Sequence, residues 1–489
     1  MTQSPTPSKQ TYINAIGIYY ERLILKLEDD IFDRNNCEMN IFDDIVNVIM
    51  QELKQDIFPK FIKSNYYKLY IQCKSLENEM VIKDDFHILR ILGRGAFGYV
   101  NACIKKNTGE IYAMKCINKK RVMATDSVET IMSERNFLAD MESKFVTGLK
   151  YAVMDNETLY LIIDLMVGGD LKFHLNKEGK FGRTRSRFYA AEVLLGLEHV
   201  HSKGIIYRDL KLENILVDDR GHVKISDLGL SVIVMTEENK EEILRNQKKP
   251  NPNVTIHGIR GYAGTPGYTA PEVVLSHYYK HIVDFFSLGV MIYRFLCGKK
   301  PFQSKKRHRG QGHRQHDQRR ATAELDRNVV EMEPDFPHQY FSPESKSLLK
   351  GLLCKDNKKR LGWNGIDEIK NHPWFDSIDF GMLEAGYVEA PYAPSLDEIH
   401  AEQPANIGPP PQDVKYDKVK ITNEFENSLK GFRFQSKKVI QEEIVNVLKK
   451  VINERKVSNI DELNIFDFES NNSQTRKNAD SCMGTCNIL

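Results

Sequence analysis

The sequence predicts an α+β fold in which a helical N-terminal region precedes a β-rich part and a larger helical part. Residues 10–85 are dominated by helical patterns, as in IFDDIVNVIMQELKQ, where apolar residues recur along one face and indicate a packing surface. These apolar residues are Ile41, Ile45, Val48, Ile49 and Leu53. From Asp85 the pattern changes to short runs rich in Ile and Val, with a hairpin turn at residues 107–109. Helical patterns then dominate residues 186–375.

Composition narrows the class of protein. The chain has 69 basic and 67 acidic residues, a net charge of +2. Its overall charge is nearly balanced and therefore gives no electrostatic preference for a nucleic acid partner. The start, MTQSPTPSKQ, lacks the apolar run of a signal peptide, and no run of 18 apolar residues suggests a membrane span. The eight cysteines form no CxxC pair, which is typical of reduced thiols. We therefore expect a cytoplasmic protein.

Two polar segments interrupt the helical part. The first is TEENKEEILRNQKKPNPN, and the second is KKRHRGQGHRQHDQRR at residues 305–320, with seven Lys or Arg residues against one Asp. The second segment is interpreted as a solvated loop, and contact with an anionic membrane surface is the alternative. Its three histidines lack the fixed geometry of a metal site. After residue 375 the chain becomes Pro-rich, which indicates a tail that lies over a surface.

A glycine-rich turn between two strand patterns is the first candidate for phosphate binding. In LGRGAFGYV the glycines would let the backbone approach phosphate groups closely. A dinucleotide site has the same spacing but requires a helix next, and YVNACI is typical of a strand. The residues of this turn are Leu92, Gly93, Arg94, Gly95, Ala96, Phe97, Gly98, Tyr99 and Val100.

The strand AMKC then supplies Lys115, a cation suited to phosphates. A helix follows, and it should contain a carboxylate that orients this lysine. Glu134 lies at helical spacing from Ile131 and Leu138, on the face expected to pack inward, whereas Glu129 falls nearly opposite. We therefore predict that Glu134 pairs with Lys115.

Two later motifs contain the remaining parts for phosphoryl transfer. YRDLKLEN brings Asp209, Lys211 and Asn214 into one loop, and SDLG brings Asp227 after a strand. Phosphoryl transfer needs a carboxylate near the attacking hydroxyl and oxygen ligands for magnesium. Farther on, Glu272 of GTPGYTAPE is predicted to form an ion pair with Arg360 of KKRLG.

Residues 86–375 resemble the eukaryotic protein kinases in the order of all these motifs. The resemblance implies a bilobal fold with a small β-rich N-lobe and a helical C-lobe, and it implies ATP and Mg²⁺ as cofactors. It further implies that Asp209 is the base, that Lys211 contacts the transferred phosphate, and that Lys211 marks the Ser/Thr branch. The same resemblance gives the metal ligands as Asn214 and Asp227, the backbone contacts to adenine as Asp164 and Met166, and the ribose contact as Asp170.

A finer resemblance covers YRD, GTPGYTAPE, the Pro-rich tail, DLG, GGDLKFHL and DFFSLG. Together these are similar to the AGC group and, within it, to the G-protein-coupled receptor kinases. FPKFIKSNYYKLYIQCK and IDELNIF resemble that family's regulator-of-G-protein-signalling homology domain. The predicted domains are a partial homology domain at residues 1–85, the kinase domain at 86–375, an AGC-type extension at 376–435, and a terminal helix with a lipidation tail at 436–489.

Two departures from the AGC pattern bear on control and specificity. Gly261 occupies the place of the usual phosphorylated threonine, so Arg208 lacks its usual phosphate partner and we expect activation by docking. Arg294 occupies a place where basophilic relatives have Glu. Glu213 and Asp170 remain as arginine contacts, but Arg294 favours acidic or phosphorylated substrate segments.

The resemblance implies a Ser/Thr protein kinase that acts on an activated G-protein-coupled receptor or another protein, with an anionic membrane surface and G-protein subunits as further partners. A generic AGC kinase with soluble substrates and a catalytically silent membrane scaffold are the alternatives. The C-terminal CNIL fits a prenylation signal on Cys486, with Cys482 as a palmitoylation site. We therefore expect peripheral attachment to a membrane from the cytoplasm.

Overall fold

The computed structural model describes residues 43–455, apart from residues 96, 237–238, 240–253, 304–313, 396–415 and 417. Its described residues divide into two compact units, one of residues 43–79 with 445–455 and one of residues 80–444. Several predictions from the sequence lie outside the described residues: those on Ala96, Cys482 and Cys486, and those on the segment IDELNIF. The predicted lipidation therefore stays a prediction.

The described N-terminal residues are helical, as the sequence predicts. Their elements are α2 (Asp43–Glu52), a π-helical turn (Leu53–Ile57), α3 (Phe58–Phe61) and α4 (Asn65–Asn78). Ile49 and Leu53 lie on the predicted packing face, yet each is 39% exposed. Among the described residues, this face therefore has no partner that buries it.

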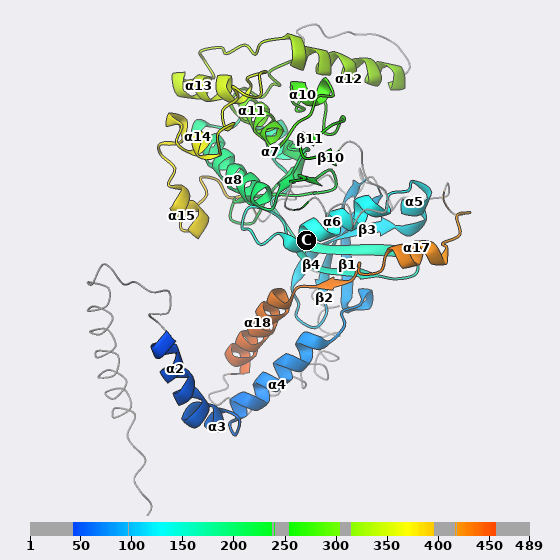
Figure 1. The fold of residues 1–489 in the computed structure, drawn as a ribbon, viewed down its shortest axis with the longest axis vertical. Coiled ribbons are helices and arrows are strands. Elements are labelled where there is room, and N and C mark those ends of the chain that lie inside the picture. Colours follow the sequence, from blue (N-terminus) through cyan, green and yellow to red (C-terminus); the bar gives the residue numbers. More distant parts are fainter. Residues whose placement is uncertain are drawn as a thin grey trace, which may run out of the picture. The chain divides into compact units, whose positions relative to one another are not determined.

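A six-stranded antiparallel sheet forms the smaller lobe of the second unit (Figure 1). Its strand order is β1-β2-β3-β5-β4-β12. The strands are β1 (Phe86–Gly95), β2 (Gly98–Lys105), β3 (Ile111–Asn118), β4 (Leu149–Met154), β5 (Thr158–Asp164) and β12 (Phe434–Gln435). The predicted hairpin turn is confirmed, because Ile104 of β2 pairs with Ile111 of β3 and Gly109 has a φ of 73°. Two helices, α5 (Lys119–Ala124) and α6 (Val128–Asp140), accompany this sheet.

The larger lobe is helical and has α11 (Ile282–Cys297) at its centre (Figure 1). Almost every side chain of α11 is buried, as the sequence VDFFSLGVMIYRFL requires, because a helix that is apolar on all sides is stable only inside a core. The helix ends at Gly298, whose φ of 77° suits a left-handed cap. The other helices are α7 (Leu171–Glu178), α8 (Arg183–Ser202), α10 (Pro271–Val274), α12 (Arg314–Glu331), α13 (Pro343–Leu352), α14 (Asp367–Lys370) and α15 (Phe380–Ala385).

In its described residues the larger lobe also contains three short two-stranded sheets. They pair β6 (Ile205–Ile206) with β9 (Val232–Ile233), β7 (Ile215–Val217) with β8 (Val223–Ile225), and β10 (Val254–Thr255) with β11 (Gly258–Ile259). Short strands of this kind hold the intervening loops by main-chain hydrogen bonds.

One prediction about this lobe is wrong in part. The basic segment 305–320 is predicted to be a loop, but residues 314–320 belong to α12. The predicted loop was inferred from charge alone, and charged residues with good helix propensity extend a helix that is anchored by its later, buried turn at Val329. Residues 304–313 lie outside the described residues.

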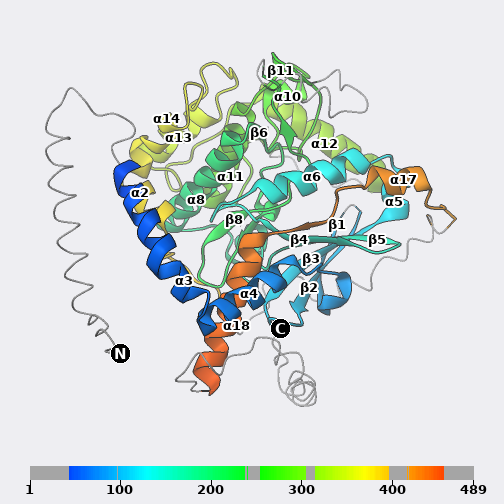
Figure 2. The same cartoon turned by 60° about the horizontal axis from the view of Figure 1, so that its bottom comes forward.

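The chain after residue 375 lies against both lobes. Gly221 of the larger lobe has no room for a Cβ, because the carbonyl of Tyr392 would lie 1.7 Å from it. On the smaller lobe α17 (Asn423–Ser428) lies beside α5, where Lys119 and Glu426 form an ion pair of 2.8 Å (Figure 2). The tail then adds β12 to the sheet and continues into α18 (Lys437–Arg455).

No helix in the described part of the chain combines the length and the apolar character that crossing a bilayer requires.

Candidate active site

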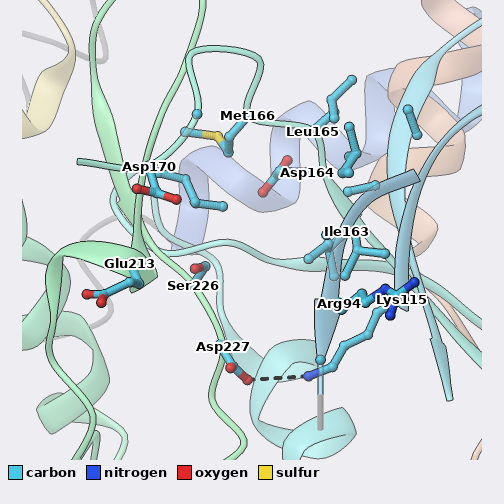
Figure 3. Close-up of a pocket in the computed structure, with 18 of the residues that line it drawn as sticks. Arg94, Lys115, Ile163, Asp164, Leu165, Met166, Asp170, Glu213, Ser226 and Asp227 are labelled. Carbon is cyan, nitrogen blue, oxygen red and sulfur yellow. Dashed lines mark hydrogen bonds and ion pairs between the residues drawn. The ribbon is translucent and has the colours of Figure 1, made fainter. Parts of the chain in front are cut away.

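A cleft of about 1070 Å³ lies between the sheet and the helical lobe (Figure 3). It is lined by residues from the glycine-rich turn, from β3, from α6 and from the loops of the larger lobe. The predicted site residues that line it are Leu92, Gly93, Arg94, Gly95, Phe97, Val100, Lys115, Glu134, Asp164, Met166, Asp170, Asp209 and Asp227. Gly98, Tyr99, Lys211 and Asn214 are not among its lining residues.

The glycine-rich turn joins β1 to β2 and covers one side of the cleft. A Cβ at Gly98 would lie 1.9 Å from the carbonyl oxygen of Cys116, so only glycine fits this position. In contrast, a Cβ at Gly93 or Gly95 would meet no protein atom within 4 Å. These two glycines therefore leave open space beside bare backbone, which suits a phosphate-bearing ligand.

Lys115 and Glu134 form the predicted ion pair. Lys115 Nζ lies 2.5 Å from Glu134 Oε1. It also lies 3.3 Å from Asp227 Oδ1, the contact drawn as a dashed line in Figure 3. Glu134 is only 3% exposed, whereas Glu129 lies on the exposed side of α6. Burial opposes protonation of Lys115, but the two carboxylates outweigh this effect and raise the pKa of Lys115 above its ordinary value. Lys115 is thus a permanent cation that lines the cleft.

Asp227 has an unusual backbone conformation, with a φ of 57°. Its Oδ1 also accepts a hydrogen bond from the Gly229 amide at 3.3 Å. Burial would raise the pKa of Asp227, but Lys115 more than offsets this, so the pKa lies below its ordinary value. A carboxylate held ionised in a strained backbone conformation is typical of a functional position.

The loop of residues 207–214, called the catalytic loop below, brings Asp209, Lys211 and Asn214 together. Lys211 Nζ donates to Asp209 Oδ2 at 2.6 Å, and Asn214 Nδ2 donates to the same oxygen at 3.1 Å and to the Asp209 carbonyl at 3.0 Å. The buried carboxylate of Asp284 fixes the start of this loop, because it accepts hydrogen bonds from the amides of Tyr207 and Arg208. One carboxylate therefore lies in a fixed position with a cation and an amide beside it.

Sequence reasoning missed Thr265 as a site residue. Its Oγ1 donates to Asp209 Oδ1 at 2.6 Å and accepts from Lys211 Nζ at 3.3 Å. The motif GTPGYTAPE places Thr265 directly after Gly264, but nothing in the motif indicates that this hydroxyl reaches the loop that contains Asp209.

At the other end of the cleft, the side chains of Asp164 and Asp170 are occupied by the protein. The Asp164 carboxylate pairs with Lys150 at 2.8 Å and with Lys224 at 3.2 Å, so only its backbone is left for the predicted contact with adenine. Asp170 Oδ1 accepts from the Phe173 amide at the start of α7, and burial raises the pKa of Asp170. Met166 lines the cleft between these two residues (Figure 3).

The predicted metal ligands fit a divalent ion that is bound mainly through phosphates. Among the described residues, no group of three or more His, Cys, Asp or Glu side chains is arranged to hold a metal. Asn214 and Asp227 instead offer an amide oxygen and a carboxylate. Hard divalent ions such as Mg²⁺ accept this oxygen donor set and take further ligands from phosphate and water.

The predicted ion pair of Glu272 and Arg360 is confirmed. Arg360 Nη1 and Nη2 donate to the two carboxylate oxygens of Glu272 at 2.6 and 2.8 Å. Both side chains are buried, so the pair joins α10 to the segment that follows α13. It supports the site without contributing to its chemistry.

Three cations, Lys172, Arg294 and Lys300, lie near Glu213 of the catalytic loop. Glu213 is paired with Lys172 at 2.9 Å, and this cation outweighs burial and lowers the pKa of Glu213. Arg294 donates to the hydroxyl of Tyr268, and Lys300 Nζ lies 4.9 Å from the ring of the same tyrosine. Of the two carboxylates considered as arginine contacts, Glu213 pairs with Lys172 through Oε1 while its buried Oε2 has no hydrogen-bond partner among the described residues, and Asp170 accepts through Oδ1 from the Phe173 amide.

Comparison with known proteins agrees with this geometry. The family described as "Protein kinase domain" matches residues 86–375. "Beta-adrenergic receptor kinase 1" of Homo sapiens is 38% identical over 376 residues, which cover 76% of this chain and 50% of the relative. "G protein-coupled receptor kinase 2" of Drosophila melanogaster is 36% identical over 407 residues, with 80% and 53% covered. "G protein-coupled receptor kinase 4" of Mus musculus is 35% identical over 379 residues, with 77% and 61% covered.

The chain thus spans about half the length of the first two of these relatives and 61% of the third. The residues that the family model matches, 86–375, include every predicted residue of the ATP and metal sites. The order of motifs, the bilobal fold and the relatives agree with one another, and the chain belongs to the protein kinase family, within the group of G-protein-coupled receptor kinases.

Proposed function

We propose that this protein transfers the γ-phosphate of ATP to serine or threonine hydroxyls of a protein substrate, with Mg²⁺ as the divalent ion. The observation that carries the proposal is the joint placement of two groups of residues at one cleft. Lys115, paired with Glu134, faces the cleft from the smaller lobe, and Asp209 and Asp227 face it from the larger lobe. Kinase chemistry depends on both groups being in place at once.

In this mechanism the oxygen of the substrate hydroxyl forms a bond to the γ-phosphorus while Asp209 accepts the hydroxyl proton. The bond between the γ-phosphorus and the β–γ bridging oxygen breaks, and ADP leaves. Lys211 and Thr265 keep the Asp209 carboxylate oriented, and Lys211 adds positive charge where the transferred group becomes more negative. Lys115 orients the ATP phosphates. The metal, when bound, neutralises phosphate charge, and Asn214 and Asp227 would hold it.

The substrate proposed is a cytoplasmic segment of an activated G-protein-coupled receptor, because the relatives carry the names of receptor kinases. Lys172, Arg294 and Lys300 lie beside the catalytic loop, which supports a preference for acidic or phosphorylated segments. Anionic membranes and G-protein subunits stay predictions. No feature of the site supports a catalytically silent scaffold, since Lys115, Asp209 and Asp227 are all in place.

The test is phosphate incorporation from labelled ATP by the full chain, compared with the Asp209→Asn variant. An acidic and an Arg-rich peptide of equal length, each with one serine, serve as substrates. We expect the variant to lose at least about 100-fold in kcat, because general base catalysis and positioning are removed together. We expect the acidic peptide to be the better substrate.

Equal incorporation by the wild type and by Asp209→Asn would refute the kinase proposal. A clear preference for the Arg-rich peptide would refute only the proposed substrate class and would leave the chemistry intact.

A further inference from the structure

Residues 254–272, called the activation segment below, have a glycine at the place where the resemblance to the AGC group implies a phosphorylated threonine. Gly261 lies there, with a φ of 114°, so another residue could occupy this position only with backbone strain. The guanidinium of Arg208 nevertheless is held by the protein. Its Nε donates to the carbonyl of Leu230 at 2.6 Å, and its Nη1 lies 3.4 Å from the hydroxyl of Tyr279.

Tyr279 connects Arg208 to Gly261. Its hydroxyl donates to the Gly261 carbonyl at 3.1 Å and receives the longer, weaker bond from Arg208. Tyr279 is only 2% exposed, so its hydroxyl is largely shielded from bulk water. The Tyr279 hydroxyl thus binds the main-chain carbonyl of Gly261, at the position where a phosphothreonine would bind Arg208 through its side chain.

The backbone of Tyr279 fixes the start of the same segment. Its amide and carbonyl each form a hydrogen bond of 2.9 Å with Ile259, two residues before Gly261. A Cβ at Gly258 would lie 2.5 Å from the Tyr279 carbonyl, so the β10–β11 hairpin lies directly against this tyrosine. The whole stretch from Gly258 to Gly261 is therefore anchored on one residue.

Anchoring this stretch determines where Thr265 lies. A Cβ at Gly264 would lie 2.7 Å from the carbonyl of Arg208, so the segment after Gly261 runs in close contact with the catalytic loop. Thr265 follows at once and donates to Asp209. Release of the Gly261 carbonyl would loosen this contact and, with it, the orientation of the Asp209 carboxylate.

We propose that Tyr279 is a positioning residue that takes the place of activation-segment phosphorylation, by joining Arg208 to the Gly261 carbonyl through its buried hydroxyl. The inference rests on the proposed kinase function. In this arrangement the Leu230 carbonyl and the Tyr279 hydroxyl accept from Arg208, and the Tyr279 hydroxyl donates to the Gly261 carbonyl. The segment therefore needs no covalent modification to take up this arrangement.

The neighbouring tyrosine provides a matched control. Tyr278 is 45% exposed, so Tyr278→Phe removes a hydroxyl one residue away without touching the network. Steady-state kinetics with the full chain and the acidic peptide would compare wild type, Tyr279→Phe and Tyr278→Phe well below their thermal midpoints.

We expect Tyr279→Phe to lower kcat/KM for the peptide about tenfold, the effect of losing a buried hydrogen bond that orients a catalytic group. KM for ATP should change less than twofold, because Lys115 and the glycine-rich turn are not part of the network. Tyr278→Phe should behave like the wild type. A change in the kinetics of the peptide without a change in KM for ATP indicates a positioning role, because a general loss of stability would change the kinetic constants for both substrates.

Phosphatase treatment of the wild type gives a second measurement that does not depend on whether a variant folds. Full activity after treatment, with no phosphate found by mass spectrometry on residues 254–279, is expected. Loss of activity on treatment would overturn the proposal, and so would unchanged kinetics of Tyr279→Phe or an equal loss in Tyr278→Phe. An inactive wild type would instead refute the proposed function itself.

Discussion

Glu443 carries a carboxylate that is 3% exposed and lies on the sheet of the smaller lobe. It accepts from Lys105 Nζ at 2.5 Å, from the hydroxyl of Tyr112 at 2.5 Å and from the hydroxyl of Tyr151 at 2.8 Å. Burial and this carboxylate raise the pKa of both tyrosines far above the ordinary value, so both remain donors at any physiological pH. A buried charge of this kind is stable only while every partner is present.

Glu443→Gln is therefore expected to lower the free energy of unfolding by about 3 kcal/mol, because it leaves the Lys105 ammonium buried without a counter-charge. The adjacent Glu442→Gln is the control, since Glu442 is exposed. Urea unfolding at pH 7 measures both variants. Equal free energies for the two would contradict a stabilising role for the buried carboxylate.

Residues also differ in how far the sequence could predict them. The pairing of Lys115 with Glu134 followed from helical spacing, because only one of the two nearby glutamates faces the core. Thr265 and Tyr279 could not be predicted in the same way. Each acts through a hydroxyl whose partner lies 18 to 71 positions away in the sequence, and no local pattern encodes such a contact.

At the scale of elements, the tail supports the helix that carries Glu134. Arg135, the next residue of α6, donates from Nε to the carbonyl of Phe432 and from Nη2 to the carbonyl of Arg433, both at 2.9 Å. Phe432 is fully buried in the core together with Phe425 and Leu429. The tail thus fixes the outer side of α6 while Lys115 contacts its inner side.

Phe432→Ala is expected to lower the free energy of unfolding by about 3 to 5 kcal/mol, since it removes a buried ring and leaves a cavity. It should also lower kinase activity by more than the loss of folded protein explains, because α6 loses its outer support. Chemical unfolding and specific activity per folded molecule measure the two effects.

Lys430→Ala serves as the control for this tail variant, because Lys430 is exposed and lies two residues away. If Phe432→Ala lost stability but kept full specific activity, the tail would have no role in positioning α6.

The α12 helix illustrates the limit of charge patterns at this scale. The residues at its start are basic and polar, so the sequence alone suggests a solvated loop. The helix persists because its later turn is anchored, with Val329 fully buried and Lys355 donating to the carbonyl of Val329 at 2.7 Å. A helix nucleated by tertiary packing can extend through residues that would not start one.

At the scale of the whole kinase unit, the cleft is built from both lobes, so a ligand that bridges it should stabilise the fold. A non-hydrolysable ATP analogue with Mg²⁺ at about 100 times its dissociation constant adds about 2.7 kcal/mol, a rise of about 5 °C in Tm. Lys115→Met and removal of the metal by a chelator should each abolish most of this rise. An equal rise in the Lys115→Met protein would contradict the assignment of the phosphate site.

The sequence by itself determined the α+β class, the glycine-rich turn between two strands and the order of the kinase motifs, and it predicted the candidate ATP and metal residues, most of which line the cleft. These features depend on local spacing, which a chain encodes directly: a glycine where backbone must be bare, and a carboxylate on the inner face of a helix. The Glu272–Arg360 pair was also predicted, because both residues belong to recognisable motifs.

Only the tertiary structure decided what joins these motifs. It placed Thr265 against Asp209, Tyr279 between Arg208 and Gly261, and Glu443 among two tyrosines and a lysine. Contacts of this kind form between segments far apart in the chain, and their strength comes from burial, which exists only once the protein has folded.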